Sequence, residues 1–420
     1  MVLPVYLLLD MAFKRVLSKV ELVTNLHETP NGPYATMTSN SHLVEVSKET
    51  YSQILRIKEQ YGYSDITPGI RIGHLDHHYL SGKFFCHDRL DKFGEVPIEK
   101  RAIVAGFGPT NPPTAGTLSV LLKTISLQRE TGCYTEIVVS NLGAYLSRNV
   151  EWDYIETITK RFLDFICYCG FDLTKGRIRT HIDKENLGIS SFLSENIFTM
   201  ADFDSNREAT EELYGTMNLL GPRLGIIVDT TYTVSDIIKP LFNSRLVKEE
   251  PHEKERILVI AGIEEHYFVR LARIAIERIG HRFPGQYISE NAEVSALYGR
   301  LIPGLAPYPK MSKSIPDSSI SLGDSQHTIM DKIMQCAEEN ERVILEMMTQ
   351  ASNWSQERIS SAFCAFSNRH KNPLVWKLMK EEYALHFIEI SSAWDKATAN
   401  HPFPATTLSK RQRETASGGS

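Results

Sequence analysis

Short apolar runs alternate with longer periodic segments between residues 101 and 279. The short runs are typical of buried strands, and they are Ala102–Ala105, Glu136–Ser140, Arg177–Ile182 and Arg256–Ile260. The longer segments repeat apolar positions every three to four residues, as amphipathic helices do, and they are Leu118–Glu130, Trp152–Cys169 and Tyr267–Ile279. Strands that alternate with helices of this length predict an α/β fold with a parallel sheet.

Strand patterns become scarce after Asp324, where helical patterns cover His327–Thr349, Ser355–Phe366 and Leu374–Ala397. The first 95 residues mix apolar runs with turn-rich polar stretches, as an extension or a small α+β domain does. We therefore expect four parts: an extension over residues 1–75, an α/β domain over 76–325, an α-helical domain over 326–404 and a disordered tail over 405–420.

Composition narrows the class of protein. The 420 residues carry a net charge of −5, so no overall positive field attracts nucleic acid, although a local basic patch is compatible with this charge. Six cysteines in a chain of this length do not make a disulfide scaffold. The apolar run near the N-terminus is far shorter than the ~20 residues of a membrane span, and no basic segment precedes it. We expect a cytoplasmic protein with no membrane partner.

The loop around Lys310 and Lys313 carries the most specific chemistry in the chain. The two lysines are three positions apart, with Ser312 and Ser314 beside them and Pro/Gly turns before them. A mobile cationic loop of this kind can fold over a triphosphate and neutralise charge as pyrophosphate leaves. Two lysines at this spacing are more often found on the solvated face of a helix. The interpretation as a phosphate-binding loop therefore depends on the flanking residues.

A Gly/Pro-rich turn connects the first predicted strand to the first predicted helix, from Gly106 to Thr117. Such a turn brings free backbone N–H groups together with the positive end of a helix, where an anion such as an ATP phosphate binds. Taken alone the turn is weak evidence, because Gly106 and Gly108 lack the third glycine of the dinucleotide fingerprint.

Together these segments resemble a known family. Lys310–Ser314 reads KMSKS and resembles the signature loop of class I aminoacyl-tRNA synthetases, and Pro316–Asp324 resembles the version in tryptophanyl-tRNA synthetases. His77–Leu80, Phe84–Asp88 and Cys169–Asp172 resemble further segments of the archaeal and eukaryotic members. The likeness extends from about His77 to Ile333. It also explains the histidines of His74–His78 without a metal, so we expect no metal site.

The resemblance implies a Rossmann-type catalytic domain, an α-helical anticodon-binding domain and a homodimer. It also implies that ATP and Mg²⁺ activate an amino acid through an aminoacyl-adenylate. Lys310 and Lys313 would hold the β- and γ-phosphates, and Ser312 and Ser314 would orient the loop or touch phosphate. The residues that would line the ATP site are Gly106, Gly108, Thr114, Gly116, Thr117 and Met311.

The chain departs from the family both in the part of the site that would bind ATP and in the part that would bind the amino acid. Thr114-Ala115-Gly116-Thr117 stands where the family usually has His-Ile-Gly-His, so hydroxyls replace two potential cations. In the predicted strand Ile137–Asn149, Gly143 and Ala144 replace a Glu and a Lys near the substrate ammonium. The amino-acid-binding candidates at matched or neighbouring positions are Phe107, Gly143, Asp229, Asp236 and Glu265.

Asp229 and Glu265 place carboxylates at positions where the family has none. Buried carboxylates are costly unless a cation pairs with them, so we hypothesise a substrate other than tryptophan that bears a positive group. Asp229 stands where the resemblance places a glutamine that contacts the amino acid. In the alternative interpretation Asp229 points away and a neighbour such as Asp236 fills the role of that glutamine.

Three functions remain open at this point. One is a tRNA ligase, and another is a synthetase-like paralogue that passes the activated amino acid to a different acceptor. The third is a degenerate synthetase that acts as a binding or regulatory protein, which the loss of both signature histidines favours. The intact Lys310 and Lys313 favour an enzyme. The sequence does not identify the amino acid, the acceptor or the role of the N-terminal extension.

Overall fold

A computed structural model describes residues 54–147, 151–203, 224–248, 253–305 and 316–403, together with Ser52 and Met311. The tail expected over residues 405–420 and most of the extension expected over residues 1–75 lie outside the described residues. No described helix is long and apolar enough to cross a membrane.

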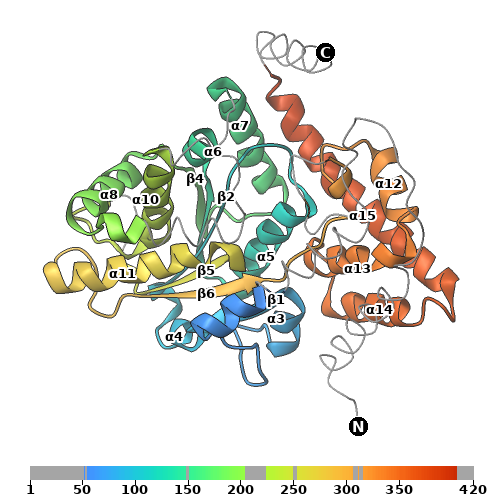
Figure 1. Cartoon of the computed structure of the whole chain (residues 1–420), viewed down its shortest axis with the longest axis horizontal. Helices are drawn as coiled ribbons and strands as arrows, with labels where there is room; N and C mark the ends of the chain where they lie inside the picture. Colours follow the sequence, from blue (N-terminus) through green and yellow to red (C-terminus); the bar gives the residue numbers. More distant parts are fainter. Residues whose placement is uncertain are drawn as a thin grey trace, which may run out of the picture.

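A sheet of six strands forms the centre of the protein, in the order β1-β6-β5-β2-β3-β4 (Figure 1). The strands are β1 (Phe84–Asp88), β2 (Arg101–Phe107), β3 (Tyr134–Val139), β4 (Gly176–Thr180), β5 (Arg256–Gly262) and β6 (Glu293–Gly299). All neighbouring pairs are parallel except β1 and β6, which are antiparallel. The predicted α/β fold is therefore confirmed, with an antiparallel strand added at one edge.

Alternation along the strands gives the sheet two buried faces. In β2, Ala102 and Val104 face one core and Ile103 and Ala105 face another. The first face is covered by α8 (Lys184–Asn196), α10 (Leu224–Ile238) and α11 (His266–Arg282). The second face is covered by α3 (His77–Lys83), α4 (Leu90–Gly94), α5 (Ala115–Thr131) and α7 (Trp152–Tyr168). A strand buried on both sides explains the short, continuous apolar runs in the sequence.

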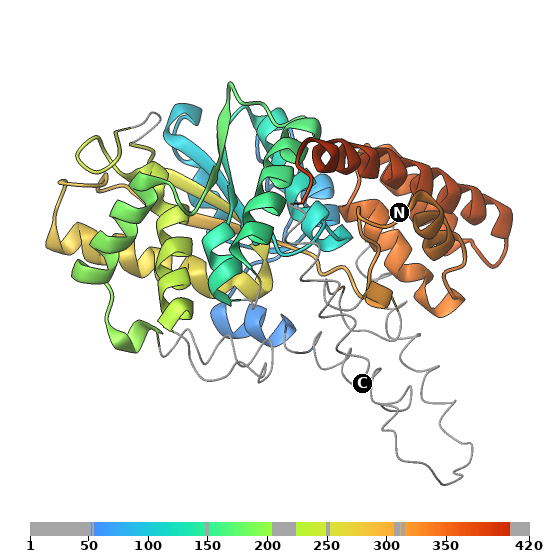
Figure 2. The same ribbon diagram turned by 90° about the horizontal axis from the view of Figure 1, so that it is seen from above.

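Helices α12 (Gln326–Met334), α13 (Glu341–Gln350), α14 (Gln356–Ser367) and α15 (Pro373–Asn400) form a group beside the sheet, as Figures 1 and 2 show. This group shares one apolar core with α5 and α7. The ring of Trp394 on α15 lies 5.0 Å from the ring of Phe162 and 5.5 Å from that of Phe165, both on α7. These contacts anchor the helical group to the sheet on the β3 side.

Two predicted elements are wrong in extent. The strand expected over Ile137–Asn149 ends at Val139, and α6 (Asn141–Ser147) follows it. The side-chain oxygen of Asn141 accepts a hydrogen bond from the Leu142 N–H at 2.9 Å, so it bonds to the backbone at the start of the helix. The helix expected over His327–Thr349 is two helices, because α12 ends at Met334 and α13 begins at Glu341.

Candidate functional site

The candidate site lies where the parallel strands end. In α/β sheets ligands bind outside the carboxyl ends of the strands, which here are the ends of β2, β3, β4 and β5. Two groups of predicted residues lie along this edge. One group surrounds the start of α5, and the other surrounds the ends of β3 and β4.

The start of α5 is free of side-chain caps. Thr114 is the N-cap residue, yet its side chain makes no capping hydrogen bond, and the first turn holds no acidic residue. A side chain at Gly116 would meet only the Thr114 hydroxyl, at 3.7 Å, so the backbone there is open to close approach. The helix end therefore offers N–H groups and partial positive charge to an anion.

The two signature segments meet at this helix. The Ala115 N–H donates to the Ile320 carbonyl at 3.2 Å, and the Leu322 N–H donates to the Pro113 carbonyl at 2.9 Å. Thr114 and Ser321 form the antiparallel bridge between these bonds. The residues that follow the KMSKS sequence are thus hydrogen-bonded to the turn at the start of α5.

The base of the KMSKS loop is also closed. The Leu305 N–H donates to the Ser318 carbonyl at 2.9 Å, which joins the two ends of the segment. Lys310, Ser312, Lys313 and Ser314 lie outside the described residues. Met311 is described, and it packs against the core shared by α5 and the C-terminal helices. The loop therefore starts and ends beside the N-terminus of α5.

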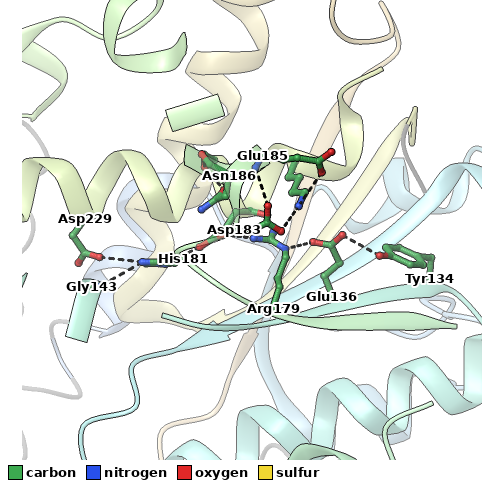
Figure 3. A network of polar contacts seen from close by, with 12 residues as sticks. Tyr134, Glu136, Gly143, Arg179, His181, Asp183, Glu185, Asn186 and Asp229 are labelled. Carbon is green, nitrogen blue, oxygen red and sulfur yellow. Dashed lines mark hydrogen bonds and ion pairs between the residues drawn. The ribbon is translucent and has the colours of Figure 1, made fainter. Parts of the chain in front are cut away.

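A buried ionic network occupies the ends of β3 and β4 (Figure 3). Arg179 on β4 donates from Nε to Glu136 on β3 at 2.5 Å, and its Nη2 donates to the Asp236 carbonyl at 2.7 Å. Its Nη1 pairs with the Asp236 carboxylate. Burial alone would lower the pKa of Arg179, but the two carboxylates raise it above its usual value. Burial also favours neutral Asp236, yet Arg179 and His181 hold its pKa below the usual value.

His181 connects this network to the open edge. Its Nε2 lies 2.7 Å from Asp236 Oδ2, and its Nδ1 accepts a hydrogen bond from the Gly143 N–H at 3.3 Å. One ring nitrogen therefore faces a carboxylate, and the other faces a backbone N–H donor. The ring is fully buried.

Asp229 on α10 is the carboxylate of this cluster that reaches solvent. Its side chain is 23% exposed, and its Oδ1 lies 4.0 Å from His181 Nδ1. Within the described residues no lysine or arginine forms an ion pair with it. Burial raises the pKa of Asp229 to about 6; His181 opposes the shift, and Asp236 adds to it. A carboxylate in this setting is suited to a cationic ligand group.

Gly143 on α6 is required by the position of Asp229. A Cβ atom at residue 143 would lie 2.1 Å from Asp229 Oδ1 and 3.2 Å from His181 Cε1. Gly143, Asp229 and Asp236, all predicted as amino-acid-binding residues, are therefore neighbours. Asp236 is engaged by Arg179 and His181 and is only 6% exposed, so it is poorly placed to take the role of a substrate ligand.

The remaining amino-acid-binding candidates, Phe107 and Glu265, are on other elements of the fold than Asp229. The Phe107 ring turns toward α7 and lies 5.1 Å from the Phe162 ring. Glu265 ends the short helical turn η3 (Ile263–Glu265) after β5. Asp229 is on α10, a different element.

Sequence reasoning missed Arg179 and His181. A signal was present, because Arg177, Arg179 and His181 alternate along a predicted buried strand. Charged residues on a buried strand face require partners of opposite charge. Within the described ranges no group of three or more His, Cys, Asp or Glu side chains is arranged to hold a metal ion. The expectation of no metal site stays a prediction.

Sequence comparisons point to one enzyme family. A family model described as "tRNA synthetases class I (W and Y)" matches residues 247–388. The tryptophan–tRNA ligase of Sulfolobus acidocaldarius is 26% identical over 204 residues. That alignment covers 48% of this chain and 44% of the relative, so less than half of the relative is matched.

Solved structures share the fold at low identity. A tryptophanyl-tRNA synthetase from Encephalitozoon cuniculi, bound to tryptophan, has a TM-score of 0.59 at 20% identity and covers 84% of this chain and 97% of its own. The Giardia lamblia tryptophanyl enzyme has a TM-score of 0.62 at 17% identity and covers 89% and 98%. A tyrosyl-tRNA synthetase from Archaeoglobus fulgidus, complexed with L-tyrosine, has a TM-score of 0.55 at 15% identity and covers 82% and 99%. The fold is thus shared with enzymes of two amino-acid specificities.

Proposed function

We propose that this chain is a class I tRNA synthetase of the tryptophanyl type and that it activates an amino acid with ATP. The single observation that carries this proposal is the backbone pairing of Pro113–Ala115 with Ile320–Leu322, which joins the turn before α5 to the chain that leaves the KMSKS loop. An intact lysine loop next to an uncapped helix start is an arrangement suited to a triphosphate.

The ATP half would act by positioning and charge stabilisation. The backbone at Gly106, Gly108 and Gly116 would lie along the nucleotide, and the hydroxyls of Thr114 and Thr117 would donate to phosphate or ribose. An amino-acid carboxylate oxygen attacks the α-phosphorus, and the bond from that phosphorus to the β-phosphate oxygen breaks, so pyrophosphate leaves. Lysines 310 and 313 would stabilise the charge on that leaving group. Mg²⁺ bound to the ATP phosphates supplies further positive charge.

The amino-acid half would hold its ligand through Asp229. In the cluster at β3 and β4, three carboxylates (Glu136, Asp229 and Asp236) face one guanidinium, that of Arg179, and the imidazole of His181, so the carboxylates outnumber the guanidinium. A ligand ammonium next to Asp229 would reduce this deficit. The deficit supports a substrate other than tryptophan that carries a positive group in addition to its α-ammonium.

The acceptor and the assembly belong to the same proposal. Transfer of the activated amino acid to tRNA follows the family, and transfer to another molecule is the alternative for a divergent paralogue. The replacement of both signature histidines by Thr114 and Thr117 favours a second candidate, a catalytically degenerate binding or regulatory protein. A homodimer through the α/β domain follows from the family resemblance.

ATP–pyrophosphate exchange with each of the twenty amino acids tests the proposal. We expect exchange with one amino acid other than tryptophan, and at least an about 100-fold loss when both Lys310 and Lys313 are changed to Ala. Preference for tryptophan would overturn the substrate proposal alone. Absence of exchange with every amino acid, together with retained ATP binding, would favour the degenerate protein.

A further inference from the structure

A polar cavity of about 450 Å³ lies on the outer edge of the sheet. Its walls come from the chain around Tyr61 and Tyr63, from the end of β1 and from α11. In the sheet order, β1 is three strands from β2 and five from β4. The cavity is therefore separate from the site formed by Thr114 and Asp229, and the proposed function makes no use of it.

Arg273 presents an unpaired donor at this cavity. Its Nη1 donates to Asp88 Oδ2 at 2.5 Å and its Nε donates to the Val294 carbonyl at 2.8 Å. Its Nη2 is buried and has no hydrogen-bond partner. A buried N–H group without a partner costs free energy comparable to a lost hydrogen bond, so such groups are rare in folded proteins. The arrangement calls for an acceptor at Nη2.

Arg270 supplies a second guanidinium on the same side of α11. Residues three apart on a helix share one face, and both arginines line the cavity. The Arg270 guanidinium lies 4.3 Å from the centre of the Tyr61 ring, and the residue is exposed. No carboxylate among the described residues forms an ion pair with it. Stacking on tyrosine restrains the guanidinium while leaving its N–H edge available.

The other charged groups of the cavity are largely matched. Asp88 is neutralised by Arg273, and Arg89 pairs with Glu293 at 3.1 Å. Asp91 remains, on the exposed first turn of α4. Glu293 also lies 3.7 Å from Arg273 Nε, so three arginines and three carboxylates balance in charge around the cavity. Arg273 Nη2 and the Arg270 guanidinium, both on α11, are the donors of the lining without a carboxylate partner among the described residues. An anion would therefore bind next to α11.

We propose that this cavity binds a phosphate group between Arg273 Nη2 and the Arg270 guanidinium. Planar guanidinium forks match the oxygen geometry of phosphate and form charge-assisted hydrogen bonds with it. The volume admits a phosphate ester larger than the inorganic ion. The phosphate comes either from a small phosphate ester or from the backbone of an RNA, two sources with the same chemistry at this point.

Calorimetric titration of the full chain with inorganic phosphate and with ribose 5-phosphate tests the site. Ribose 5-phosphate lacks the adenine that an ATP site recognises. We expect Arg270→Gln to weaken binding about tenfold or more, the loss of one charge-assisted contact. Arg282→Gln is the matched control, because Arg282 is an exposed arginine on the same helix that also lies over an aromatic ring, that of Phe283, at 5.6 Å. This control should bind within about twofold of the unaltered chain.

A short single-stranded RNA distinguishes the two sources. Competition between ribose 5-phosphate and the RNA, with both lost in Arg270→Gln, supports a site that reads backbone phosphate. Binding of ribose 5-phosphate alone supports a small phosphate ester. The proposal is overturned if the unaltered chain takes up none of the three probes, or if Arg270→Gln and Arg282→Gln bind them equally well.

Discussion

The ATP half and the amino-acid half of the candidate site consist of different kinds of chemical group. At the start of α5 the groups that face the edge are backbone N–H groups, glycines and the Thr114 hydroxyl, while the charged lysines are on a separate loop. At the ends of β3 and β4 the groups are charged side chains that contact one another, such as Glu136, Arg179 and Asp236. A site made of backbone groups does not depend on any one side chain, whereas a buried charge network requires every partner. The amino-acid half should therefore be the more sensitive of the two to a single substitution.

The largest expected effect comes from breaking the network. Arg179→Met leaves Glu136 and Asp236 buried without a cation, which should lower the free energy of unfolding by about 3–5 kcal/mol. Arg129→Met is the control, because Arg129 pairs with Glu130 at the surface, where ion pairs contribute under about 1 kcal/mol. Urea denaturation measures both. Equal losses in the two variants would contradict a specifically buried network.

Asp229→Asn separates ligand binding from stability. We expect an about 100-fold loss in kcat/KM for pyrophosphate exchange, which is about 2.7 kcal/mol of lost binding. Asp229 must be ionised to hold an ammonium, and its pKa is raised to about 6. The exchange rate of the unaltered protein should therefore fall as the pH drops below about 6. An unchanged rate in the variant would remove Asp229 from the site.

The same substitution should stabilise the protein at neutral pH. Because the folded pKa of Asp229 exceeds its ordinary value of 3.8, the folded state holds the proton more tightly than the unfolded state. Its contribution to stability is present below pH 3.8 and is lost as the pH rises through about 6. Asp229→Asn removes this loss, which should raise the free energy of unfolding at pH 7 by about 3 kcal/mol. Denaturation at pH 4 and pH 7 checks the sign.

Much of the fold could be predicted from the sequence, because buried strands and amphipathic helices carry strong local patterns. The strands β2 and β5 were found this way, and α5, α7 and α11 as well. The edge strand β1 and the helix α6 were missed, since both are short and α6 begins only two residues after the last residue of β3. Tertiary contacts decide such short segments.

The candidate site was only partly predictable for a different reason. Gly143, Asp229 and Asp236 were named individually, but their common neighbour His181 directly follows β4, 38 residues from Gly143 in the chain. Contacts between distant segments leave no local pattern in a single sequence. Phe107 and Glu265 were grouped with Asp229 by position in the family.

A smaller effect is expected at the glycine that accommodates Asp229. Gly143→Ala introduces a Cβ at 2.1 Å from Asp229 Oδ1, and overpacking of this kind costs about 1–3 kcal/mol. Gly188→Ala in α8 is the control, since nothing lies within 4 Å of its new Cβ, and it should stabilise the helix by up to about 1 kcal/mol. Combining Gly143→Ala with Asp229→Ala should recover part of the loss. Full additivity of the two changes would show that the residues do not touch.

The smallest effect is expected in the ATP half, where substitutions of Thr114 and Ser325 can be compared. Thr114 and Ser325 both precede helices, but only Ser325 caps its helix, through a bond from the Thr328 N–H. Ser325→Ala should therefore cost about 1 kcal/mol of stability with no change in the KM for ATP. Thr114→Val keeps the shape of the side chain and removes the hydroxyl. It should change stability by less than about 0.5 kcal/mol and raise the KM for ATP about threefold to tenfold. If Thr114→Val instead lowers stability and leaves the KM unchanged, the hydroxyl supports the helix, and the ATP half rests on the backbone alone.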